Sequence, residues 1–234
     1  MDSDYFYSIF DRSRKLVGVD ALEMLSKKRV LVFGLGGVGG YCVEALARSG
    51  VGNFTLVDKD VVDETNINRQ IIATMETIGQ EKTKVFEKRL LSINPGLSID
   101  CRSIFYLPGM EGEFSFGEYD FVVDCVDTVS AKLSIVEEAL KNEVNVISAM
   151  GCGNKTHPEM LVIEDIYKTK ICPLAKTIRH ECRKRKLQGF PVAYSVEQPI
   201  VNESPPASMM FVPAVAGIMM ASYIVNKWIN TQFE

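Results

Sequence analysis

Short apolar runs alternate with amphipathic segments along the first 150 residues of the chain. The run RVLVFG at 29–34 is rich in β-branched residues and ends in glycine, which is typical of a strand buried on both faces. The same reasoning predicts strands at 53–57, 98–103, 119–124 and 144–149, and helices at 41–49, 81–93 and 130–141. Strands that alternate with helices indicate a Rossmann-like, doubly wound α/β fold, with a mostly parallel sheet and helices on both of its faces.

The alternation weakens after Gly151. Two more strands are expected at 160–166 and 192–196, and a basic helical segment separates them. With 234 residues, of which 47% are hydrophobic, the chain can bury one substantial core. We therefore expect a single domain with an elaborated C-terminal part.

An almost wholly apolar stretch covers residues 207–225, a length that suffices to cross a bilayer. It is interrupted by Ser208, Pro213, Gly217 and Ser222, and basic residues do not flank it at both ends. A transmembrane helix stays open as an alternative. The interruptions favour a helix that begins near Pro213 and is buried within the protein or at a subunit contact, so we expect no membrane association.

Net charge and cysteine usage bound the function class. A net charge of −4 and a pI near 5.4 argue against a surface that is basic all over, and DNA is not an expected partner. The first ten residues lack the features of a secretory signal, which favours the cytoplasm. The six cysteines form no CxxC pair, so buried thiols are expected rather than disulfides or zinc ligands.

The segment after the first strand has the spacing of a phosphate-binding turn. Gly34, Gly36 and Gly39 form GxGxxG, and Gly37 lies within it. The missing side chains allow a tight turn and let backbone N–H groups approach phosphates at the start of the next helix. Asp58 ends the second strand nineteen positions after Gly39, where a carboxylate can accept hydrogen bonds from ribose hydroxyls. A solvated loop aspartate is the alternative for Asp58.

Polar residues after Asp58 distinguish ATP from NAD, because both nucleotides suit a GxGxxG turn. Asn66, Arg69 and Gln70 follow shortly, and Lys82 lies at the start of the next helix. The glycine turn already serves the diphosphate of NAD, whereas the β- and γ-phosphates of ATP need additional positive charge. This order of residues therefore favours ATP over the cofactor of a dehydrogenase.

Asp127 is a candidate ligand for Mg²⁺. It follows a predicted strand, at the end where doubly wound sheets place their ligands. Magnesium is commonly bound by one or two carboxylates together with phosphate oxygens. The alternative is that Asp127 caps the helix that begins near Ser130.

Together these motifs resemble the adenylating domain of ubiquitin-activating-type enzymes, whose bacterial members activate molybdopterin and thiamine sulfur carriers. The resemblance covers Arg12 to Gly153 and rests on GLGGVGG (34–40), LVDKDVVDETNINRQ (56–70), Lys82 and DCVDT (124–128). It implies an ATP-binding core over 1–153 and a closing segment over 154–234 that contacts the substrate. The residues that it implies for ATP are Gly34, Gly36, Gly37, Gly39, Asp58 on the ribose, and Asn66, Arg69, Gln70 and Lys82, with Mg²⁺ on Asp127.

The resemblance also implies a homodimer. Arg12 is similar to an arginine that dimers of this family insert into the ATP site of the partner subunit, and two-fold dimers are the commonest assembly. The expected catalytic residues are Arg12, Arg69, Lys82 and Asp127.

Further segments resemble one branch of the family, the tRNA threonylcarbamoyladenosine dehydratases. They are DRSRKLVG (11–18), GCGNK (151–155), CPLAKTIRHECRKRK (172–186), VAYSVEQP (192–199) and FVPAVAGIMMAS (211–222). Cys172 and Cys152 depart from the branch, where aspartate and alanine are expected. The branch implies that ATP activates the threonine carboxylate of a modified adenosine beside the tRNA anticodon. The neighbouring carbamoyl group then closes a ring with net loss of water, which needs no enzyme nucleophile because the attacking group lies within the substrate.

A basic segment favours an RNA partner independently of this resemblance. Eight cations fall within residues 168–186 of an acidic protein, and such a cluster can meet phosphates. The candidates for tRNA contact are Lys176, Arg179, Arg183, Lys184, Arg185 and Lys186. A solvated helix face would have the same composition.

Two other functions stay open at this point. An activator of a ubiquitin-like sulfur carrier would adenylate a protein C-terminus. It would work with a sulfur-relay partner protein, and Cys172 or Cys182 would be its candidate nucleophile, with a thiol pKa lowered by basic surroundings. A nucleotide-binding regulatory protein without turnover is the third possibility. His157 and His180 are expected to be surface or structural residues.

Overall fold

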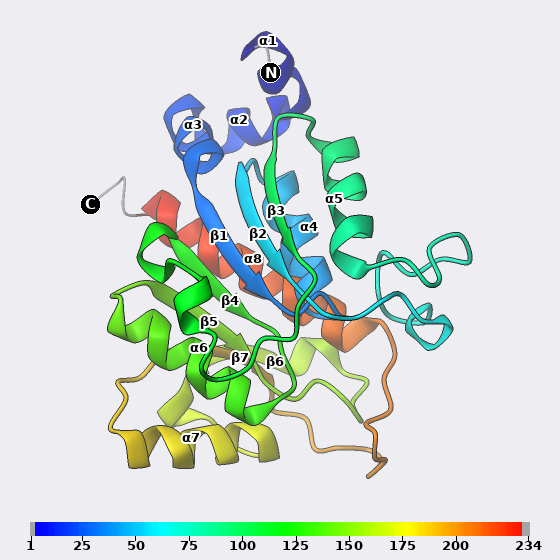
Figure 1. Ribbon diagram of the computed structural model, residues 1–234, viewed down its shortest axis with the longest axis vertical. Coiled ribbons are helices and arrows are strands. Elements are labelled where there is room, and N and C mark those ends of the chain that lie inside the picture. Colours follow the sequence, from blue (N-terminus) through cyan, green and yellow to red (C-terminus); the bar gives the residue numbers. More distant parts are fainter. Residues whose placement is uncertain (1–2, 231–234) are drawn as a thin grey trace.

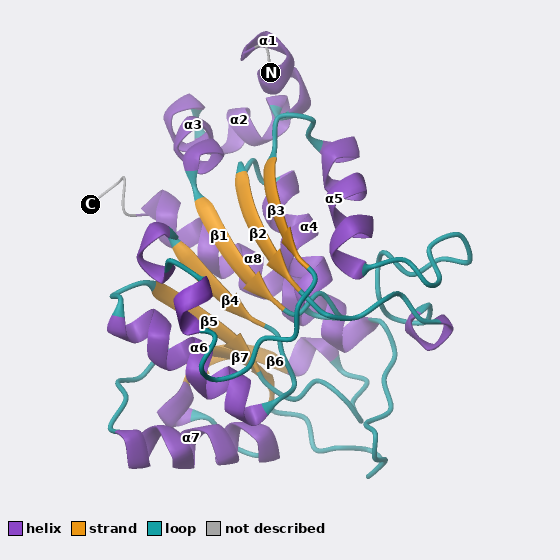
Figure 2. Ribbon diagram, viewed as in Figure 1, coloured by secondary structure: helices purple, strands orange, loops and turns teal. Residues whose placement is uncertain are grey.

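Seven strands form one sheet in the computed structural model, which describes residues 3–230 (Figures 1 and 2). The sheet order is β3-β2-β1-β4-β5-β7-β6, and only β6 runs antiparallel to its neighbour. The strands are β1 (Arg29–Phe33), β2 (Asn53–Val57), β3 (Ser98–Arg102), β4 (Phe121–Asp124), β5 (Asn145–Ala149), β6 (Leu161–Asp165) and β7 (Pro191–Ser195). The predicted Rossmann-like α/β fold is confirmed. Residues 1–2 and 231–234 of the expected single domain lie outside the described residues.

Helices cover both faces of this sheet (Figure 2). The α-helices are α1 (Ser3–Ile9), α2 (Asp11–Val17), α3 (Val19–Lys27), α4 (Gly39–Arg48), α5 (Lys82–Ile93), α6 (Val129–Lys141), α7 (Pro173–Arg185) and α8 (Phe211–Asn230). Short 3₁₀ turns are η1 (Glu64–Asn66), η2 (Glu111–Glu113), η3 (Phe116–Glu118), η4 (Pro158–Met160) and η5 (Ile166–Lys168). The predicted helices and strands match these elements to within about two residues, which is the usual uncertainty of an element end.

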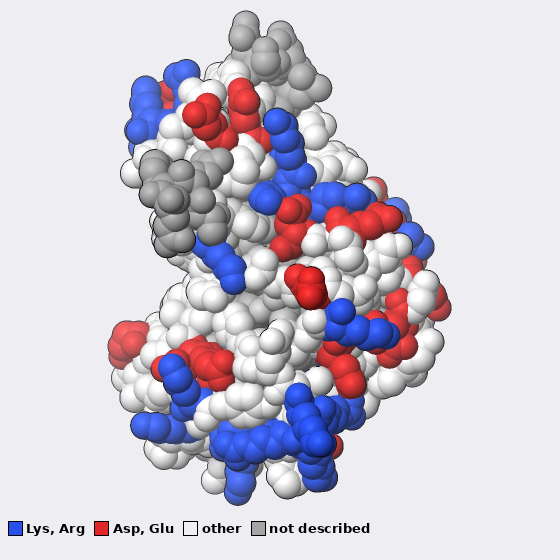
Figure 3. Space-filling model, turned by 90° about the vertical axis from the view of Figure 1, so that its left-hand side faces the viewer, with Lys and Arg blue, Asp and Glu red and all other residues white. Residues whose placement is uncertain are grey.

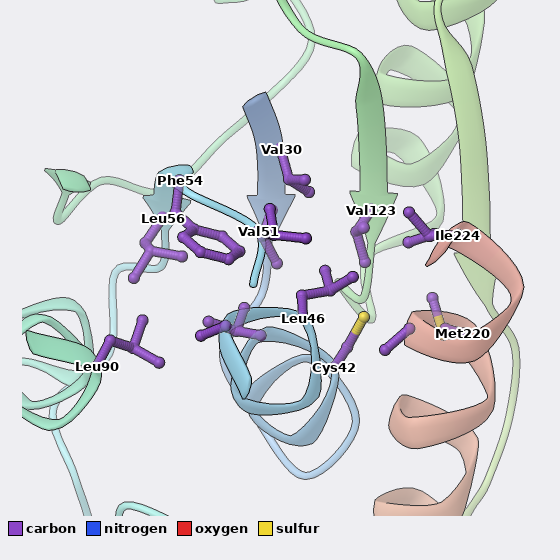
Figure 4. Packing of buried hydrophobic residues seen from close by; sticks show 14 of the residues in the cluster. Val30, Cys42, Leu46, Val51, Phe54, Leu56, Leu90, Val123, Met220 and Ile224 are labelled. Carbon is purple, nitrogen blue, oxygen red and sulfur yellow. The ribbon is translucent and has the colours of Figure 1, made fainter. Parts of the chain in front are cut away.

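Alternate residues of β1 serve two separate cores, because successive side chains of a strand point to opposite faces. Val30 and Val32 pack with α3, α4, α5 and α8, as the close view in Figure 4 shows for Val30, Leu46 and Ile224. Phe33 packs on the other face, among residues of α6, α7 and the loops before β4. Residues 30–33 are therefore all apolar for the reason expected from the sequence, because β1 is buried on both faces.

The strand expected at 119–124 begins two residues later, at Phe121. Asp120 instead accepts a hydrogen bond from the backbone N–H of Arg29 at 2.8 Å and forms an ion pair with Lys28 Nζ at 2.7 Å. Its carboxylate thus joins the start of β1 to the start of β4, a role that an alternating apolar pattern does not encode.

The apolar stretch at 207–225 forms most of α8, which begins at Phe211 and packs along α4. A Cβ on Gly217 would lie 2.2 Å from the carbonyl oxygen of Val38, so only glycine allows the two helices to approach this closely. By length and composition α8 is apolar enough to cross a membrane, yet 56% of its most apolar window is buried inside the protein. The helix thus supplies one side of the core, as the interruptions in its sequence favoured.

Candidate active site

The glycine turn joins the carboxyl end of β1 to the start of α4. Gly34 has a φ of +88°, and a Cβ at this position would lie 2.7 Å from the carbonyl oxygen of Cys125 after β4. A Cβ on Gly39 would lie 1.8 Å from the carbonyl oxygen of Gly34, so the helix can begin against the strand end only with glycine here. Around Gly36, in contrast, the nearest atom to a Cβ is the side-chain nitrogen of Gln70 at 3.9 Å. The turn is therefore closed toward the sheet and open at Gly36.

Asp58 follows β2, the neighbour of β1, and contacts the glycine turn directly. Its Oδ2 accepts from the backbone N–H of Leu35 at 2.7 Å, and its Oδ1 accepts from the backbone N–H of Asp60 at 2.8 Å. The carboxylate is half-buried. Asp58 is thus not a freely solvated loop aspartate, because it ties the end of β2 to the turn expected to hold phosphates.

Asn66 and Arg69 lie in the loop between β2 and α5. The side-chain oxygen of Asn66 accepts from the backbone N–H of Asp63 at 3.2 Å, in a capping box that orders η1. This leaves the NH₂ group of the buried Asn66 side chain to donate. One Nη of Arg69 donates to the carbonyl oxygen of Thr65 at 2.7 Å and to Asn68 Oδ1 at 2.9 Å, both neutral acceptors. The guanidinium of Arg69 is therefore oriented without being neutralised.

Lys82 is 4% exposed and forms an ion pair with Asp60, at 2.9 Å between Nζ and Oδ2. Asp60 is half-exposed and comes two residues after Asp58. The sequence analysis did not predict a role for Asp60, although the residue lies within the motif at 56–70. Its only signal was that it is an acidic residue in a loop expected to bind phosphates. An ammonium carries three N–H donors, so Lys82 keeps donors for a phosphate while Asp60 holds it in place.

Gln70 supplies a test of whether these residues suit a ligand. It is 7% exposed, and its Oε1 is one of two buried side-chain atoms of the described residues that lack a hydrogen-bond partner. Buried polar atoms are nearly always paired, so an orphaned one calls for a specific reason. Its side chain faces Gly36, the open part of the turn. Because this oxygen accepts, a ligand with a hydroxyl or amino donor would complete the pairing, and the ribose and adenine of a nucleotide carry such donors.

Asp127 lies in the loop after β4, the other neighbour of β1. The side chain is exposed, and α6 begins at Val129 with Thr128 as its N-cap, so Asp127 does not cap the helix. Within residues 3–230, no group of three or more His, Cys, Asp and Glu side chains is arranged to hold a metal ion. A magnesium ion at Asp127 would thus take its remaining ligands from phosphates and water, which is the common mode for this ion.

Sheet order explains why these residues meet. The turn follows β1, Asp58 follows β2 and Asp127 follows β4, and the three strands are adjacent and parallel. Their carboxyl ends share one edge, at which open α/β sheets bind ligands. The site residues Gly34 to Gly39, Asp58, Asn66, Arg69, Gln70, Lys82 and Asp127 lie on the loops along this edge.

Arg12 and the basic cluster lie elsewhere. Arg12 is exposed on α2, which lies with α1 and α3 at the opposite end of the sheet, where β1 begins (Figure 1). The cations of residues 176–186 lie on α7 and at its end, on the face of the sheet that α6 also covers. Neither group lies at the edge of the sheet that carries the glycine turn.

Two segments singled out in the sequence, 151–155 and 192–199, come together beside this edge. Lys155 is 5% exposed and its Nζ donates to the carbonyl oxygens of Gly151 at 3.3 Å and Ser195 at 3.2 Å. Glu197 accepts from the backbone N–H groups of Thr156 and His157. The side chains join the loops after β5 and β7, a proximity that their spacing in the sequence did not reveal.

The segment before α8 is held to the same edge. Asn68 Nδ2 donates to the carbonyl oxygen of Ser208 at 2.8 Å, and Asn154 Oδ1 accepts from the backbone N–H of Ala207 at 2.7 Å. Residues far apart in sequence thus connect the loop that carries Arg69 with the C-terminal part of the chain.

The cysteines are free, and Cys172 and Cys182 are fully buried. The favoured prediction of buried cysteines is therefore confirmed at both positions. Burial raises the pKa of Cys182 to about 11, which contradicts the alternative in which basic surroundings lower it. A thiol needs its thiolate form to attack, and neither side chain is accessible in this structure. His157 and His180 are exposed, as expected.

Comparison with known proteins identifies the family. The sequence profile of the ThiF family matches residues 10–232. The chain belongs to the ThiF family. Among its relatives, the tRNA threonylcarbamoyladenosine dehydratase of Bacillus subtilis is 39% identical over 92% of each chain. The protein of that name from Haemophilus influenzae is 38% identical over 77% of this chain and 69% of its own.

Solved structures agree with this ThiF-family assignment. The crystal structure of E. coli tRNA N6-threonylcarbamoyladenosine dehydratase, TcdA, in complex with ATP has a TM-score of 0.93 to this chain. It is 27% identical and covers 100% of this chain and 98% of its own. The same E. coli protein has also been solved in complex with AMP, at the same TM-score. Both the family resemblance seen in the sequence and its Rossmann-like fold are confirmed.

Proposed function

We propose that this chain is an ATP-dependent tRNA threonylcarbamoyladenosine dehydratase. The observation that carries the proposal is the similarity to the Bacillus subtilis enzyme over 92% of both chains, which extends well beyond the ATP-binding core expected at 1–153. A relative that shared only the ATP-binding core would support adenylation without a substrate.

The reaction has two steps. A carboxylate oxygen of the threonine attacks the α-phosphorus of ATP, the bond to the bridging oxygen breaks and pyrophosphate leaves. The carbamoyl group of the same modified adenosine then attacks the acyl carbon, loses a proton and displaces AMP, so that the net change in the nucleoside is loss of water. Proximity within one substrate supplies much of the rate of the second step, and a buried Cys172 and Cys182 are compatible with this route.

The residues of the carboxyl edge divide the work of the first step. The glycine turn takes phosphate oxygens with its backbone N–H groups, and Asp58, which already anchors that turn, takes the ribose. Arg69 and Lys82 face the negative charge that develops on the leaving pyrophosphate. Asp127 would hold Mg²⁺, which would supply positive charge to the phosphates.

The direct test combines the purified protein, ATP, Mg²⁺ and tRNA that carries threonylcarbamoyladenosine, followed by mass spectrometry of the nucleosides. We expect a product lighter by one water, formed with release of AMP and pyrophosphate. Exchange of labelled pyrophosphate into ATP that depends on a ubiquitin-like sulfur carrier, and not on this tRNA, would instead identify a carrier activator. ATP binding with neither activity would identify a regulatory protein. We also propose that the protein acts in the cytoplasm, since a tRNA substrate would be met there, and a sulfur-relay partner stays a prediction.

We further propose a homodimer in which Arg12 acts on the partner's ATP. The position of Arg12, exposed on α2 at the far end of the sheet from its own glycine turn, supports a role at a neighbouring subunit. We expect Arg12→Ala and Asp58→Ala to be inactive alone and to regain activity when mixed, because a heterodimer has one intact site. The mixture is expected to reach about a quarter of wild-type activity if subunits exchange at random in closed dimers. No recovery despite proven subunit exchange would place Arg12 outside the site.

The basic surface of α7 is proposed to bind tRNA phosphates. Figure 3 shows Lys and Arg side chains gathered at the end of the molecule that Figure 1 assigns to α7. Four of its cations already have protein partners: Arg179 on Thr169, Arg183 over the ring of Tyr167, Lys184 on Glu181 and Arg185 on Glu137. The exposed ion pairs of Lys184 and Arg185 contribute little energy and can exchange for phosphate, whereas Arg179 is half-buried against Thr169.

Charge removal tests this surface. The variant Arg183→Ala/Lys184→Ala/Arg185→Ala/Lys186→Ala is expected to weaken tRNA binding and to flatten its salt dependence by about one unit of logarithmic slope per lost contact. Its affinity for ATP should not change, because these residues lie off the ATP-binding edge. A matched control removes four exposed lysines from the N-terminal helices and α5, namely Lys15, Lys27, Lys84 and Lys88. Equal effects of both quadruple variants, measured by filter binding across a salt series, would reduce the cluster to a solvated face.

A further inference from the structure

A fully buried polar network closes the carboxyl end of β4. Asp124 and Ser148 are 0% exposed and Lys132 is 1% exposed. Lys132 Nζ donates to Asp124 Oδ2 at 2.8 Å, and Ser148 Oγ donates to the same oxygen. The other oxygen, Oδ1, accepts from the backbone N–H of Val126 at 3.2 Å. Strand β4, the first turn of α6 and strand β5 thus meet at one carboxylate.

Stability alone is a poor reason for such a network. Taking a carboxylate and an ammonium out of water costs more than their attraction often returns, and well-packed apolar residues in their place are often neutral or stabilising. The ion pair between Lys132 and Asp124 does, however, fix one arrangement of the loop that follows Asp124. It orients the Asp124 carboxylate, whose other oxygen accepts a hydrogen bond from the backbone of that loop.

This loop contacts the glycine turn. The backbone N–H of Cys125 donates to the carbonyl oxygen of Phe33 at 2.7 Å. A Cβ on Gly34 would lie 2.7 Å from the carbonyl oxygen of Cys125 and 3.1 Å from the backbone nitrogen of Val126. The next residue is Asp127. The distance between the Asp127 carboxylate and the turn that holds the phosphates therefore depends on the residues that Asp124 fixes.

We propose that Lys132 is a positioning residue for the metal side of the ATP site. Through Asp124 and the backbone N–H of Val126, it fixes the separation between Asp127 and the glycine turn, and Asp127 would there hold Mg²⁺ for a bound nucleotide. The inference rests on the proposed function only in taking Asp127 as the Mg²⁺ ligand, and it holds for any adenylated substrate.

The test measures how much Mg²⁺ strengthens nucleotide binding. Calorimetry gives the affinity for a non-hydrolysable ATP analogue with Mg²⁺ and with a chelator, and the ratio of the two isolates the contribution of the metal. Lys132→Met removes the donor and keeps the length of the side chain. We expect it to reduce this ratio about tenfold, since loss of a group that orients a metal ligand typically costs 10–100-fold in metal affinity. Metal-free affinity for the analogue should stay near that of the wild type, because the glycine turn itself is retained.

Conservative variants distinguish a positioning role of Lys132 from a general disruption of the fold. Lys132→Arg keeps a cationic donor and should retain most of the ratio, whereas Ser148→Ala removes one neutral donor from Asp124 and should reduce the ratio less than Lys132→Met does. If Lys132→Met does not fold, the double variant Asp124→Asn/Lys132→Met carries the test, because it removes the buried carboxylate charge together with its partner. A wild-type ratio in that variant overturns the proposal.

Asp127→Asn separates the role of Lys132 from the assignment of Asp127 as the Mg²⁺ ligand. If this substitution lowers the ratio and Lys132→Met does not, Lys132 has no positioning role while the metal assignment stands. If neither substitution lowers it, Asp127 does not hold the metal and the role of Lys132 falls with it.

Discussion

Arg69→Ala is expected to lower turnover by about a hundredfold or more, the usual effect of removing a preorganised donor from developing charge. The side chain is half-buried and its one bonded Nη contacts only Thr65 and Asn68, which are neutral acceptors. Among the described residues, no carboxylate lies within ion-pair distance of it. A guanidinium that is oriented yet unneutralised beside the glycine turn is available to phosphate, because a carboxylate partner would have competed for the same fork of N–H donors.

Single-turnover formation of the adenylate is the measurement, with ATP affinity determined alongside. A loss in kcat with little change in ATP affinity would place the contact in the transition state, whereas a rise in KM alone would indicate ground-state binding. The matched control is Arg48→Ala at the end of α4, where the arginine pairs with Glu44 away from the site. An Arg69→Ala protein that turns over at the wild-type rate would remove Arg69 from the active site.

Gly39→Ala is expected to cost about 3 kcal/mol or more in the free energy of unfolding and to abolish ATP binding, since overpacking a dense interior costs 1–3 kcal/mol even where side chains can move. Here the obstacle is backbone: the new Cβ would lie 1.8 Å from the carbonyl oxygen of Gly34. The start of α4 must therefore move away from β1, and its N–H groups move with it.

Gly36→Ala makes the complementary prediction. Its Cβ would meet no protein atom closer than 3.9 Å, so the free energy of unfolding should change by less than about 1 kcal/mol. ATP affinity should nevertheless fall, because the methyl group occupies the open part of the turn. Gly112→Ala, which meets nothing within 4 Å and lies outside the site, controls for the substitution itself. Denaturant titration and calorimetry measure the two quantities, and equal stability of the Gly39 and Gly36 variants would contradict the packing described at Gly39.

Local patterns predicted the parallel core of the sheet because each of its elements carries its own signal. Residues 30–33 are apolar throughout because β1 is buried on both faces, and GxGxxG requires glycine because Gly39 lies against Gly34. The position of Asp58 after its strand, and its closeness to the turn, follow from the same regular βαβ geometry.

The C-terminal part was harder to predict. The two strands were expected near their observed positions. A strand pattern does not specify the direction of the strand in the sheet, so the antiparallel pairing of β6 with β7 could not be predicted. The basic composition around Cys182 suggested a lowered thiol pKa, whereas burial of the thiol raises it. Composition describes neighbours along the chain, and the pKa of a side chain is set by its neighbours in space.

By itself, the sequence determined the fold class, the order of the elements and the residue types along the ATP-binding edge, since periodicity, glycine spacing and capping act over a few residues. Only the tertiary structure decided which side chains hold others in place. The ion pair between Lys82 and Asp60, the network of Lys132, Asp124 and Ser148, and the contact between Asn68 and Ser208 join residues 8 to 140 positions apart. Such contacts depend on which strand ends the sheet order brings together, and no local pattern in the chain records that order.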